Sequence, residues 1–253
     1  MLDLRGKHVV ITGASSGIGK SLALALAREG ANVTLMARRK EALDEIAAEI
    51  AAEGGNGLAI SVDVAVKESV EEAMRQAREK AGPVDVLVAN AGIGRNMTVK
   101  RLDTSLVEDT MQINFMGVVY ASCAVLPEMI ERNEGTIVAV SSLAAWRGLP
   151  TSAPYCASKA AVSAWMEGLR VELHHTNVQL CTSHPGFIRT PMTEKNKFKM
   201  PFLMEVDDAA NALVKGIRKG KREINFPWRL VTLMRLVRFV PNWLFDRAAG
   251  GRV

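Results

Sequence analysis

The stretch Lys7-His8-Val9-Val10-Ile11-Thr12-Gly13-Ala14-Ser15-Ser16-Gly17-Ile18-Gly19 decides the fold. Its first half, Lys7 to Thr12, is a short β-branched run of the kind that forms a buried parallel strand. An Ala- and Leu-rich stretch from about Lys20 to Arg28 follows the glycines and predicts a helix that ends at Gly30. Strand, glycine turn and helix in this order form the context that a phosphate-binding turn requires.

The three glycines of this turn have separate expected tasks. Gly13 allows the tight turn, whereas Gly17 and Gly19 let a pyrophosphate and the next strand approach the backbone. The first N–H groups of the helix and the positive end of its dipole would then face the phosphates. A tight turn without a ligand is the alternative, but the complete strand–turn–helix unit favours a dinucleotide.

The end of the second predicted strand, 32–37, bears on the choice of dinucleotide. A cofactor with a free ribose 2′-hydroxyl usually meets an Asp or Glu there. This chain instead reads Ala37-Arg38-Arg39, which offers two guanidinium groups to a 2′-phosphate. We therefore expect NADP(H) rather than NAD(H), the alternative being that both arginines are solvated charges.

Farther along the chain, apolar strand-like runs alternate with amphipathic helix-like stretches. Strands are expected at 57–62, 85–89, 136–140, 178–183 and 223–226, and helices at about 40–53, up to 81, 105–132, 153–175 and 207–219. We find no internal repeat and no linker, which indicates a single α/β domain.

Composition narrows the classes of partner. The 253 residues are 48% hydrophobic and 23% charged, which is typical of a globular domain. A formal net charge of +5 and a pI of about 9.2 are compatible with nucleic acid, an acidic membrane surface or a phosphorylated ligand. No basic block has interleaved aromatic residues, so we expect no nucleic acid.

The cysteines and the N-terminus indicate a location. Cys123, Cys156 and Cys181 show no paired metal-type spacing, so we expect no metal site and reduced, mostly buried thiols. The N-terminus has no apolar core of a secretory signal, and no uninterrupted apolar run is long enough to span a bilayer. The expected location is the cytoplasm.

Tyr155 and Lys159 are the strongest candidates for chemistry. Their spacing of four puts them on one face of the helix expected at 153–175. An ammonium held close to a phenol favours the phenolate and so lowers the tyrosine pKa from about 10 toward working pH. Such a phenol can exchange a proton with a carbonyl or alcohol oxygen, although an isolated pair of this kind more often marks a solvated helix face.

Three polar residues near the expected strand ends have a structural and a functional interpretation each. Asp63 would contact adenine or cap the next helix, and both roles can hold. Asn90 would either contact the cofactor or only shape its turn. Asn114 lies among apolar neighbours and must be hydrogen-bonded if buried, so that it supports a loop or forms part of a site.

Together these pieces resemble the classical short-chain dehydrogenase/reductases. The matching pieces fall in the family's order and spacing over about residues 5 to 226: Thr12 to Gly19, Asp63, Asn90-Ala91-Gly92, Asn114, Ser142, Tyr155-Cys156-Ala157-Ser158-Lys159, Pro185-Gly186 and Thr190. The departures are Ala89, where many members have a second Asn, and Leu143 after the serine. The resemblance implies a single doubly wound Rossmann-type domain with a seven-stranded parallel sheet in the order 3-2-1-4-5-6-7.

The resemblance also implies roles for individual residues. Tyr155 is the general acid in reduction or the base in oxidation, Ser142 hydrogen-bonds the substrate oxygen, and Lys159 lowers the tyrosine pKa and holds the nicotinamide ribose. Asn114 helps to hold a water in a proton relay. The implied cofactor contacts are Gly13, Ser15, Ser16, Gly17, Ile18, Gly19, Arg38, Arg39, Asp63, Val64, Asn90, Ala91, Gly92, Tyr155, Lys159, Pro185, Gly186, Ile188 and Thr190.

Two segments bear on the substrate. Residues of about 186–206 are expected to form a mobile flap over the strand ends, with Lys195, Lys197, Phe198, Met200 and Phe202. The extension 227–253, beyond the catalytic domain 1–226, is apolar, and its Arg235, Arg238 and Asn242 fall toward one side at helical spacing. It would pack as a core or dimer helix, lie in a membrane interface or wall off a substrate pocket, and Pro241 would kink or end its helix.

The sequence therefore predicts an NADP(H)-dependent oxidoreductase acting on a carbonyl or secondary alcohol, of an apolar or lipid-like molecule. The alternative is a non-catalytic NADP(H)-binding sensor or scaffold on the same fold. The complete Ser142, Tyr155 and Lys159 set weighs against it, because a sensor has no need of a tuned phenol. The family resemblance further implies a homodimer or homotetramer.

Overall fold

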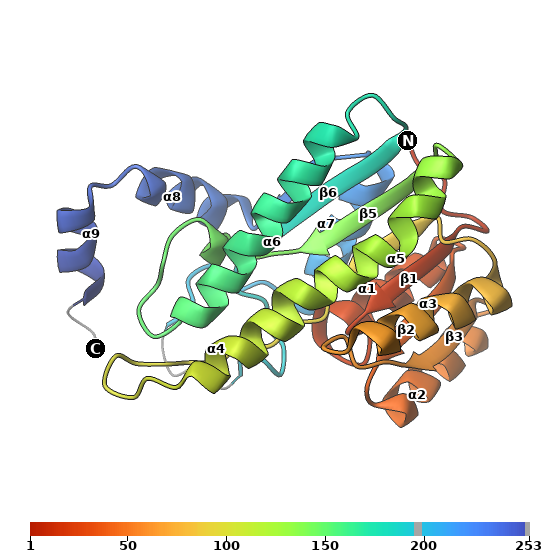
Figure 1. Cartoon of the computed structure of the whole chain (residues 1–253), viewed down its shortest axis with the longest axis horizontal. Coiled ribbons are helices and arrows are strands. Elements are labelled where there is room, and N and C mark those ends of the chain that lie inside the picture. The colour runs from red at the N-terminus through yellow and green to blue at the C-terminus, as the bar shows by residue number, and fades with distance from the viewer. Residues whose placement is uncertain (195–198, 251–253) are drawn as a thin grey trace.

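The computed structural model describes residues 1–194 and 199–250, which form a seven-stranded parallel sheet flanked by helices (Figure 1). The strand order is β3-β2-β1-β4-β5-β6-β7, which confirms the expected topology. The strands are β1 (His8–Thr12), β2 (Asn32–Ala37), β3 (Asn56–Ser61), β4 (Val86–Ala89), β5 (Gly135–Val140), β6 (Val178–Pro185) and β7 (Glu223–Phe226). The chain reverses its direction of travel across the sheet between β1 and β4, where ligands bind in such folds.

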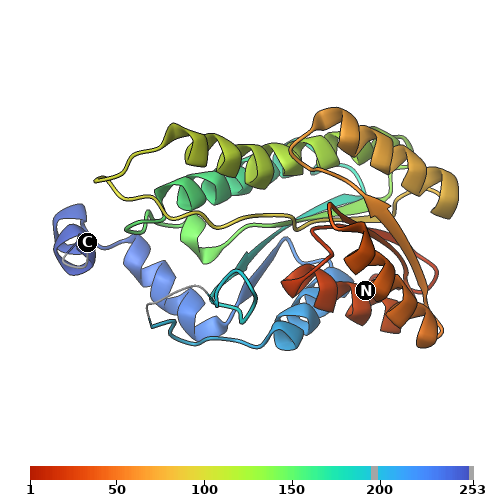
Figure 2. The same cartoon turned by 90° about the horizontal axis from the view of Figure 1, so that it is seen from below.

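Helices cover both faces of the sheet, as Figure 2 shows. One layer holds α1 (Gly17–Arg28), α2 (Lys40–Ala52) and α7 (Val206–Arg218). The other holds α3 (Lys67–Ala81), α4 (Thr104–Met111), α5 (Gly117–Glu131) and α6 (Ala153–Glu172). A parallel sheet requires this covering, because its crossovers place helices on its faces and bury both.

Strand β1 shows how the sequence fills both layers of core. Successive side chains of a strand point to opposite faces. Val9 and Ile11 pack with the α1, α2 and α7 layer, whereas Val10 packs with the opposite layer, and all three are fully buried. The β-branched run that predicted a buried strand thus contributes side chains to both layers of the core.

The helix expected at 105–132 is helical throughout but not uniform. Five residues, Gln112–Met116, form a π-helical turn, η1, between α4 and α5. Such insertions are frequent at functional sites. By length and composition alone, this helical run over 104–131 also qualifies as a membrane span, although the expectation was that no apolar run would. It packs on the sheet as part of the second layer, with 39% of its most apolar window buried.

The extension after β7 forms two helices, α8 (Trp228–Arg238) and α9 (Asn242–Ala249). Pro241 precedes α9, which confirms that the helix ends near it. The expectation that Arg235, Arg238 and Asn242 share one side of a helix was wrong, because Asn242 begins the second helix after a turn. The three last residues, 251–253, lie outside the described residues.

The described cysteines are free thiols and are mostly buried, as expected. Cys156 and Cys181 are buried, whereas Cys123 is exposed. Cys123 lies in α5, whose outward side faces away from the sheet. Helical apolar surroundings in the sequence therefore did not guarantee burial.

Candidate active site

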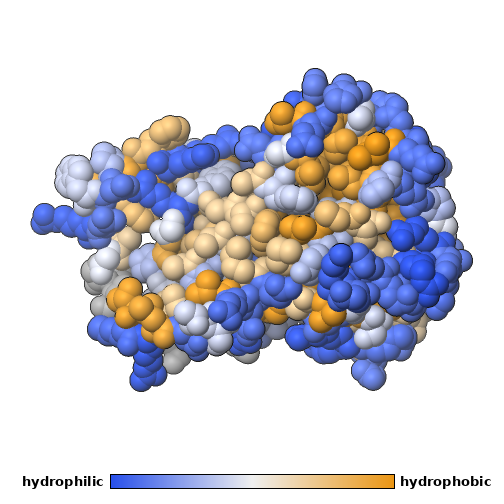
Figure 3. Space-filling model, viewed as in Figure 1, coloured by the Kyte–Doolittle hydropathy of each residue, from blue (hydrophilic) through white to orange (hydrophobic). Residues whose placement is uncertain are grey.

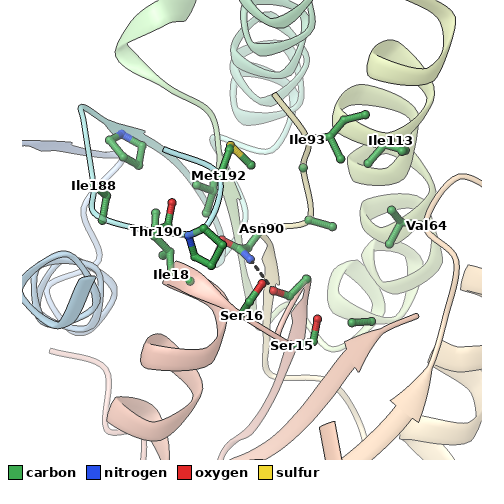
Figure 4. Close-up of a pocket in the computed structure, with 18 of the residues that line it drawn as sticks. Ser15, Ser16, Ile18, Val64, Asn90, Ile93, Ile113, Ile188, Thr190 and Met192 are labelled. Carbon is green, nitrogen blue, oxygen red and sulfur yellow. Dashed lines mark hydrogen bonds between the residues drawn. The ribbon is translucent and has the colours of Figure 1, made fainter. Parts of the chain in front are cut away.

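A cavity of about 430 Å³ opens at the carboxyl ends of the strands (Figure 4). Its wall contains every residue expected to hold the cofactor or to react, apart from Gly19 and Asn114. The glycine turn after β1, the ends of β2 to β6 and the first turns of α6 all contribute to this wall. The sheet topology thus gathers positions from residue 13 to residue 193 around one space.

The glycine turn has the geometry that the sequence requires. Gly13 and Gly17 adopt φ angles of 69° and 55°, which favour glycine. A Cβ at Gly19 would lie 2.3 Å from the Gly13 carbonyl oxygen, so Gly19 serves close packing of helix and turn rather than the cavity wall. Helix α1 begins at Gly17, earlier than expected, so that its first N–H groups belong to the glycine motif itself.

The end of β2 presents two exposed cations. The Arg39 guanidinium donates hydrogen bonds from Nη2 to the backbone oxygen of Ser15, at 3.2 Å, and to its Oγ, at 3.0 Å. Arg38 and Ala37 also line the cavity. These contacts bring positive charge and a serine hydroxyl to the position where a ribose 2′-substituent lies in dinucleotide-binding turns.

Asp63 and Asn90 shape loops at the cavity wall. The Asp63 carboxylate accepts a hydrogen bond from Ala65 N at 3.0 Å. The expected helix-cap role was wrong, because α3 is preceded by Val66 as its N-cap. Asn90 donates from Nδ2 to the carbonyl oxygen of Thr12 at 3.0 Å and so ties β4 to the glycine turn. Its side chain therefore supports the turn, and Figure 4 shows it directed at that turn.

Tyr155 and Ser142 form the reactive end of the cavity. Ser142 follows β5 and accepts a hydrogen bond from Ala144 N, at 3.1 Å, at the start of the short helix η2 (Leu143–Ala145). Its Oγ also donates to the carbonyl oxygen of Pro185 at 3.5 Å, and it lies close enough to the Tyr155 phenol to influence the pKa of that group. Both side chains line the cavity. Two hydroxyl groups can therefore meet one substrate oxygen, which is the geometry of an oxyanion site.

Lys159 is held one turn of α6 beyond Tyr155. Its ammonium is buried, and Nζ donates to the carbonyl oxygen of Val140 at 2.8 Å. Burial disfavours the charged form and lowers the pKa of Lys159 to about 8. A Cβ at Gly92 would lie 3.3 Å from Nζ, so a glycine at that position leaves room for the lysine.

The direction of the Tyr155 pKa shift differs from the expectation. Burial raises the pKa of the Tyr155 phenol above its ordinary value, and the nearby Ser142 hydroxyl opposes this only in part. The expected lowering by Lys159 is not seen in the protein alone, because burial of the phenol is the largest influence on its pKa. Tyr155 is therefore a protonated group at neutral pH and suited to donate a proton.

Asn114 is completely buried within η1 and lies behind the cavity wall. Its Oδ1 accepts from Ile93 N at 2.7 Å, and its Nδ2 donates to Ile93 O at 2.9 Å and to Ser158 Oγ at 3.0 Å. Of the two interpretations of the sequence, support of a loop is the one these contacts show. Asn114 fixes the loop after β4 to the helix that carries Tyr155 and Lys159.

Several residues of the site were not expected from the sequence. The carbonyl of Val140 accepts from Lys159, and the Ser158 hydroxyl completes the bonds of Asn114. Ile93, Ile113 and Met192 add apolar wall, as Figure 4 shows. A main-chain acceptor leaves no signal in the sequence. The apolar residues had only their place after a strand end or beside Asn114 to indicate them.

The predicted flap is described only in part. Residues 188–194 line the cavity or adjoin it, and Thr190 lies against the glycine turn, with its Cγ2 3.3 Å from the position of a Cβ at Gly17. Lys195, Lys197 and Phe198 lie outside the described residues. Among the residues described, no group of three or more His, Cys, Asp or Glu side chains is arranged to hold a metal ion.

Comparisons with known proteins show the family to which the chain belongs. A family model described as short chain dehydrogenase matches residues 7–200. An uncharacterized oxidoreductase of Myxococcus xanthus is 42% identical over 98% of both chains. The chain belongs to the short-chain dehydrogenase family.

Two relatives with named activities are also similar. The ketoacyl reductase HetN of a Nostoc species is 34% identical over 88% of this chain and 79% of its own. A mouse 3-ketodihydrosphingosine reductase is 41% identical over 78% of this chain, which spans 61% of the mouse protein.

Solved structures give the same fold. A short-chain dehydrogenase/reductase from Burkholderia phymatum in complex with NAD superposes with a TM-score of 0.87 at 24% identity, over 93% of this chain and 94% of the other. An alcohol dehydrogenase from Thermococcus sibiricus complexed with 5-hydroxy-NADP has a TM-score of 0.79 at 30% identity, over 87% and 95% of the two chains. One of these two proteins thus binds NAD and the other 5-hydroxy-NADP. From its family, the chain is a short-chain dehydrogenase/reductase-type oxidoreductase.

Proposed function

We propose that the protein is an NADP(H)-dependent oxidoreductase that transfers a hydride between the nicotinamide and a carbonyl or secondary alcohol of an apolar, lipid-like substrate. The observation that carries the proposal is that Ser142 and Tyr155 line the same cavity as the glycine turn. The Ser142 hydroxyl lies close enough to the Tyr155 phenol to influence its pKa. Lys159 stands one helical turn behind this pair.

The cofactor and each of the three side chains have a separate role in the proposed reaction. The bound cofactor supplies or accepts the hydride, which is the step that side chains cannot perform. In reduction, Tyr155 gives its phenolic proton to the substrate oxygen while Ser142 donates a hydrogen bond to the same oxygen. The Lys159 ammonium stabilises the phenolate that remains, because opposite charge nearby favours the ionised phenol. In oxidation the same groups act in reverse.

The residues of the cavity fit the dinucleotide. The first turn of α1 offers backbone N–H groups to the pyrophosphate. The Arg39–Ser15 pair and Arg38 favour a 2′-phosphate over a free hydroxyl, because that end of β2 carries cations and no carboxylate. NADP(H) is therefore the proposed cofactor.

The proposed substrate class is inferred from the apolar residues in and behind the cavity wall. Leu143, Leu230 and Val231 form a buried apolar cluster with Trp146, Phe187 and Met234 against it. Leu143 and Leu230 of this cluster lie next to Gly186 of the cavity wall. Met192 and Ile93 extend apolar surface toward the opening. Two relatives are named ketoacyl reductase and 3-ketodihydrosphingosine reductase. These observations favour a ketone on a long apolar chain.

The assembly and location are proposals of the same kind. Figure 3 shows a broad band of apolar colour across the side of the molecule where α5 and α6 lie. An apolar band of this breadth on a soluble surface favours contact with another copy, so we propose a homodimer or homotetramer in the cytoplasm. A peripheral membrane contact through the extension is developed in the next subsection.

The test is to measure turnover on a series of ketones of increasing chain length. The purified protein is mixed with NADPH and a series of ketones that differ only in chain length, and the loss of NADPH absorbance is followed. We expect kcat/KM to rise with chain length. NADPH binding without turnover on any member of the series would instead support the sensor alternative.

A further inference from the structure

An apolar and basic rim lies beside the cavity. It is defined here as the loop 93–103 after β4, residues 188–194 and 199–204 after β6, and residues 228–249, which form α8, the turn after it and α9. Both views place the loop 93–103 and these two helices at the same end of the molecule (Figures 1 and 2). Most of the large apolar side chains that are exposed belong to this rim: Val99, Leu102, Met192, Phe202, Trp228, Leu233, Leu236, Phe239, Trp243 and Leu244.

Contacts join the parts of the rim around the cavity. A Cβ on Gly94 would lie 3.5 Å from Met192, so the loop after β4 meets the segment after β6. Met97 N donates to Thr151 O at 2.9 Å, which ties the same loop to the approach to α6. Arg147 then binds the extension, with its Nη1 2.8 Å from Val240 O. The exposed apolar residues are thus held in one arrangement and not scattered along loose chain.

Helix α8 has a buried inner side, which packs on the domain, and an exposed outer side. Leu230 and Val231 are buried on the inner side, where Leu230 lies next to Gly186 of the cavity wall. The outer side carries Trp228, Leu236 and Phe239, of which Phe239 is 83% exposed. Arginines alternate with them at 229, 235 and 238. Trp with Arg on one exposed helix side is typical of a helix that lies in a bilayer interface, where rings enter the headgroup region and guanidinium groups reach the phosphates.

The charge of the rim indicates which kind of surface it can bind. Within α8 and α9 the structure describes Arg229, Arg235, Arg238 and Arg247 against a single acid, Asp246. In the loop after β4, Arg95, Lys100 and Arg101 stand against Asp103. Clustered basic residues beside exposed apolar ones are attracted to anionic lipid, whereas a second copy of this rim would meet like charge.

We propose that this rim docks on an anionic lipid bilayer and that the cleft receives its ketone substrate from that bilayer. The inference deepens the proposed function, on which the nature of the substrate rests, but docking itself depends only on the rim. A long-chain ketone would then pass from lipid to the cavity across apolar side chains without entering water.

The test uses the full chain with sedimented vesicles of phosphatidylcholine alone or mixed in equal parts with phosphatidylserine. We expect binding to the mixed vesicles, weakened by salt because exposed charges are screened, and little binding to phosphatidylcholine. Leu236→Ser/Phe239→Ser/Trp243→Ser, at three exposed positions, should abolish binding. Arg235→Glu/Arg238→Glu should weaken it by more than about tenfold.

The control is Ile130→Ser/Val171→Ser, which changes two exposed apolar residues near the far ends of α5 and α6 and should leave vesicle binding intact. Light scattering reports the mass of each variant. Failure of the wild-type protein to bind either vesicle, or equal binding by the triple variant, overturns the proposal. Loss of mass in the triple variant also overturns it, since a second copy then covers the rim.

Turnover measurements distinguish a failure of lipid docking from a failure of the proposed function. A short, water-soluble ketone should be reduced equally by the wild-type protein and the triple variant. A long-chain ketone carried in mixed vesicles should be reduced at least about tenfold more slowly by the triple variant, in keeping with its lost binding. If the protein binds mixed vesicles but reduces neither ketone, the proposed function fails and docking stands.

Discussion

The Lys159 ammonium nitrogen lies 5.9 Å from the centre of the Tyr155 ring, one helical turn away along α6. Both groups are desolvated, which moves each toward its neutral form: the Tyr155 pKa is raised, and the Lys159 pKa is lowered to about 8. At neutral pH the tyrosine therefore holds its proton while the lysine is still mostly charged. This pair is prepared to donate a proton and then to stabilise the resulting phenolate.

Removal of the phenol should abolish most turnover. Tyr155→Phe keeps the ring but loses the proton donor, and general acid catalysis contributes about 10²- to 10⁴-fold. We expect kcat to fall by about that factor while NADPH binding, measured by fluorescence titration, persists. The matched control is Tyr120→Phe, because Tyr120 is the other tyrosine of the chain and its hydroxyl accepts from Gln112. Near-normal reduction by Tyr155→Phe would exclude it as the acid.

The buried lysine should give the protein a stability that rises with pH. Lys159 has a pKa of about 8 in the folded protein, against an ordinary value of 10.5. Between these values the unfolded chain binds more protons than the folded one, so the free energy of unfolding rises as pH rises. Below about pH 8 both states are protonated, and the folded state bears the full desolvation cost, about 3 kcal/mol.

Lys159→Met isolates this effect, since the other titrating groups cancel in the comparison. In urea unfolding, the free energy of unfolding of the wild-type protein should rise relative to that of the variant by about 3 kcal/mol between pH 8 and pH 10.5. A difference between the two proteins that stays constant from pH 8 to pH 10.5 would contradict the shift.

The arginines at the end of β2 should set the cofactor preference. Arg38→Ala/Arg39→Ala removes two cations from the proposed 2′-phosphate site, and hydrogen bonds to charged groups contribute about 1.5–3 kcal/mol. We expect the KM for NADPH to rise by about 10- to 100-fold and the KM for NADH to change far less. Lys40→Ala is the control, because Lys40 pairs with Asp44 on the outer side of α2. An equal rise for both cofactors would contradict the assignment.

A methyl group at Gly19 should disturb both packing and cofactor binding. Its Cβ would lie 2.3 Å from the Gly13 carbonyl oxygen, which is a backbone atom and yields only if the turn moves. Gly19→Ala should lower the melting temperature and weaken NADPH binding together. Gly168→Ala is the opposite case, because Gly168 is helical with no atom within 4 Å of its Cβ position. It should stabilise the protein by about 0.5–1 kcal/mol.

What the sequence predicted depended on local patterns, and what it missed depended on tertiary contacts. The glycine turn and the alternating strands are local, so the sheet and the cavity wall followed from them. The π-helical turn did not, because it surrounds Asn114, whose partners Ile93 and Ser158 lie 21 and 44 residues away. The direction of the Tyr155 shift was missed for the same reason: spacing indicates a nearby cation but not the depth of burial.

The contacts of Arg147 are also long-range contacts that local patterns do not predict. This residue holds the extension to the loop between Ser142 and Tyr155. Its Nη1 lies within hydrogen-bonding distance of three carbonyl oxygens at the end of α8, those of Val237, Arg238 and Val240. Its Nη2 donates to Asn242 Oδ1 at 3.0 Å, and its Cζ lies 4.2 Å from the centre of the Phe245 ring. None of the side chains described in α9 is buried, so this helix depends on Arg147 for its position.

Arg147→Ala should therefore release α9 and the end of α8 without unfolding the domain. We expect chymotrypsin to cleave within 239–245 about tenfold faster or more, as the loss of charge-assisted hydrogen bonds implies. The KM for a long-chain ketone should rise, while a short ketone is reduced at the normal rate. Arg147→Lys should behave like the alanine variant, because an ammonium cannot reproduce a planar fork that binds several oxygens and stacks on a ring. Arg229→Ala, on the exposed side of α8, should leave the rate of cleavage unchanged. Unaltered cleavage in Arg147→Ala would show that α9 is held by other contacts.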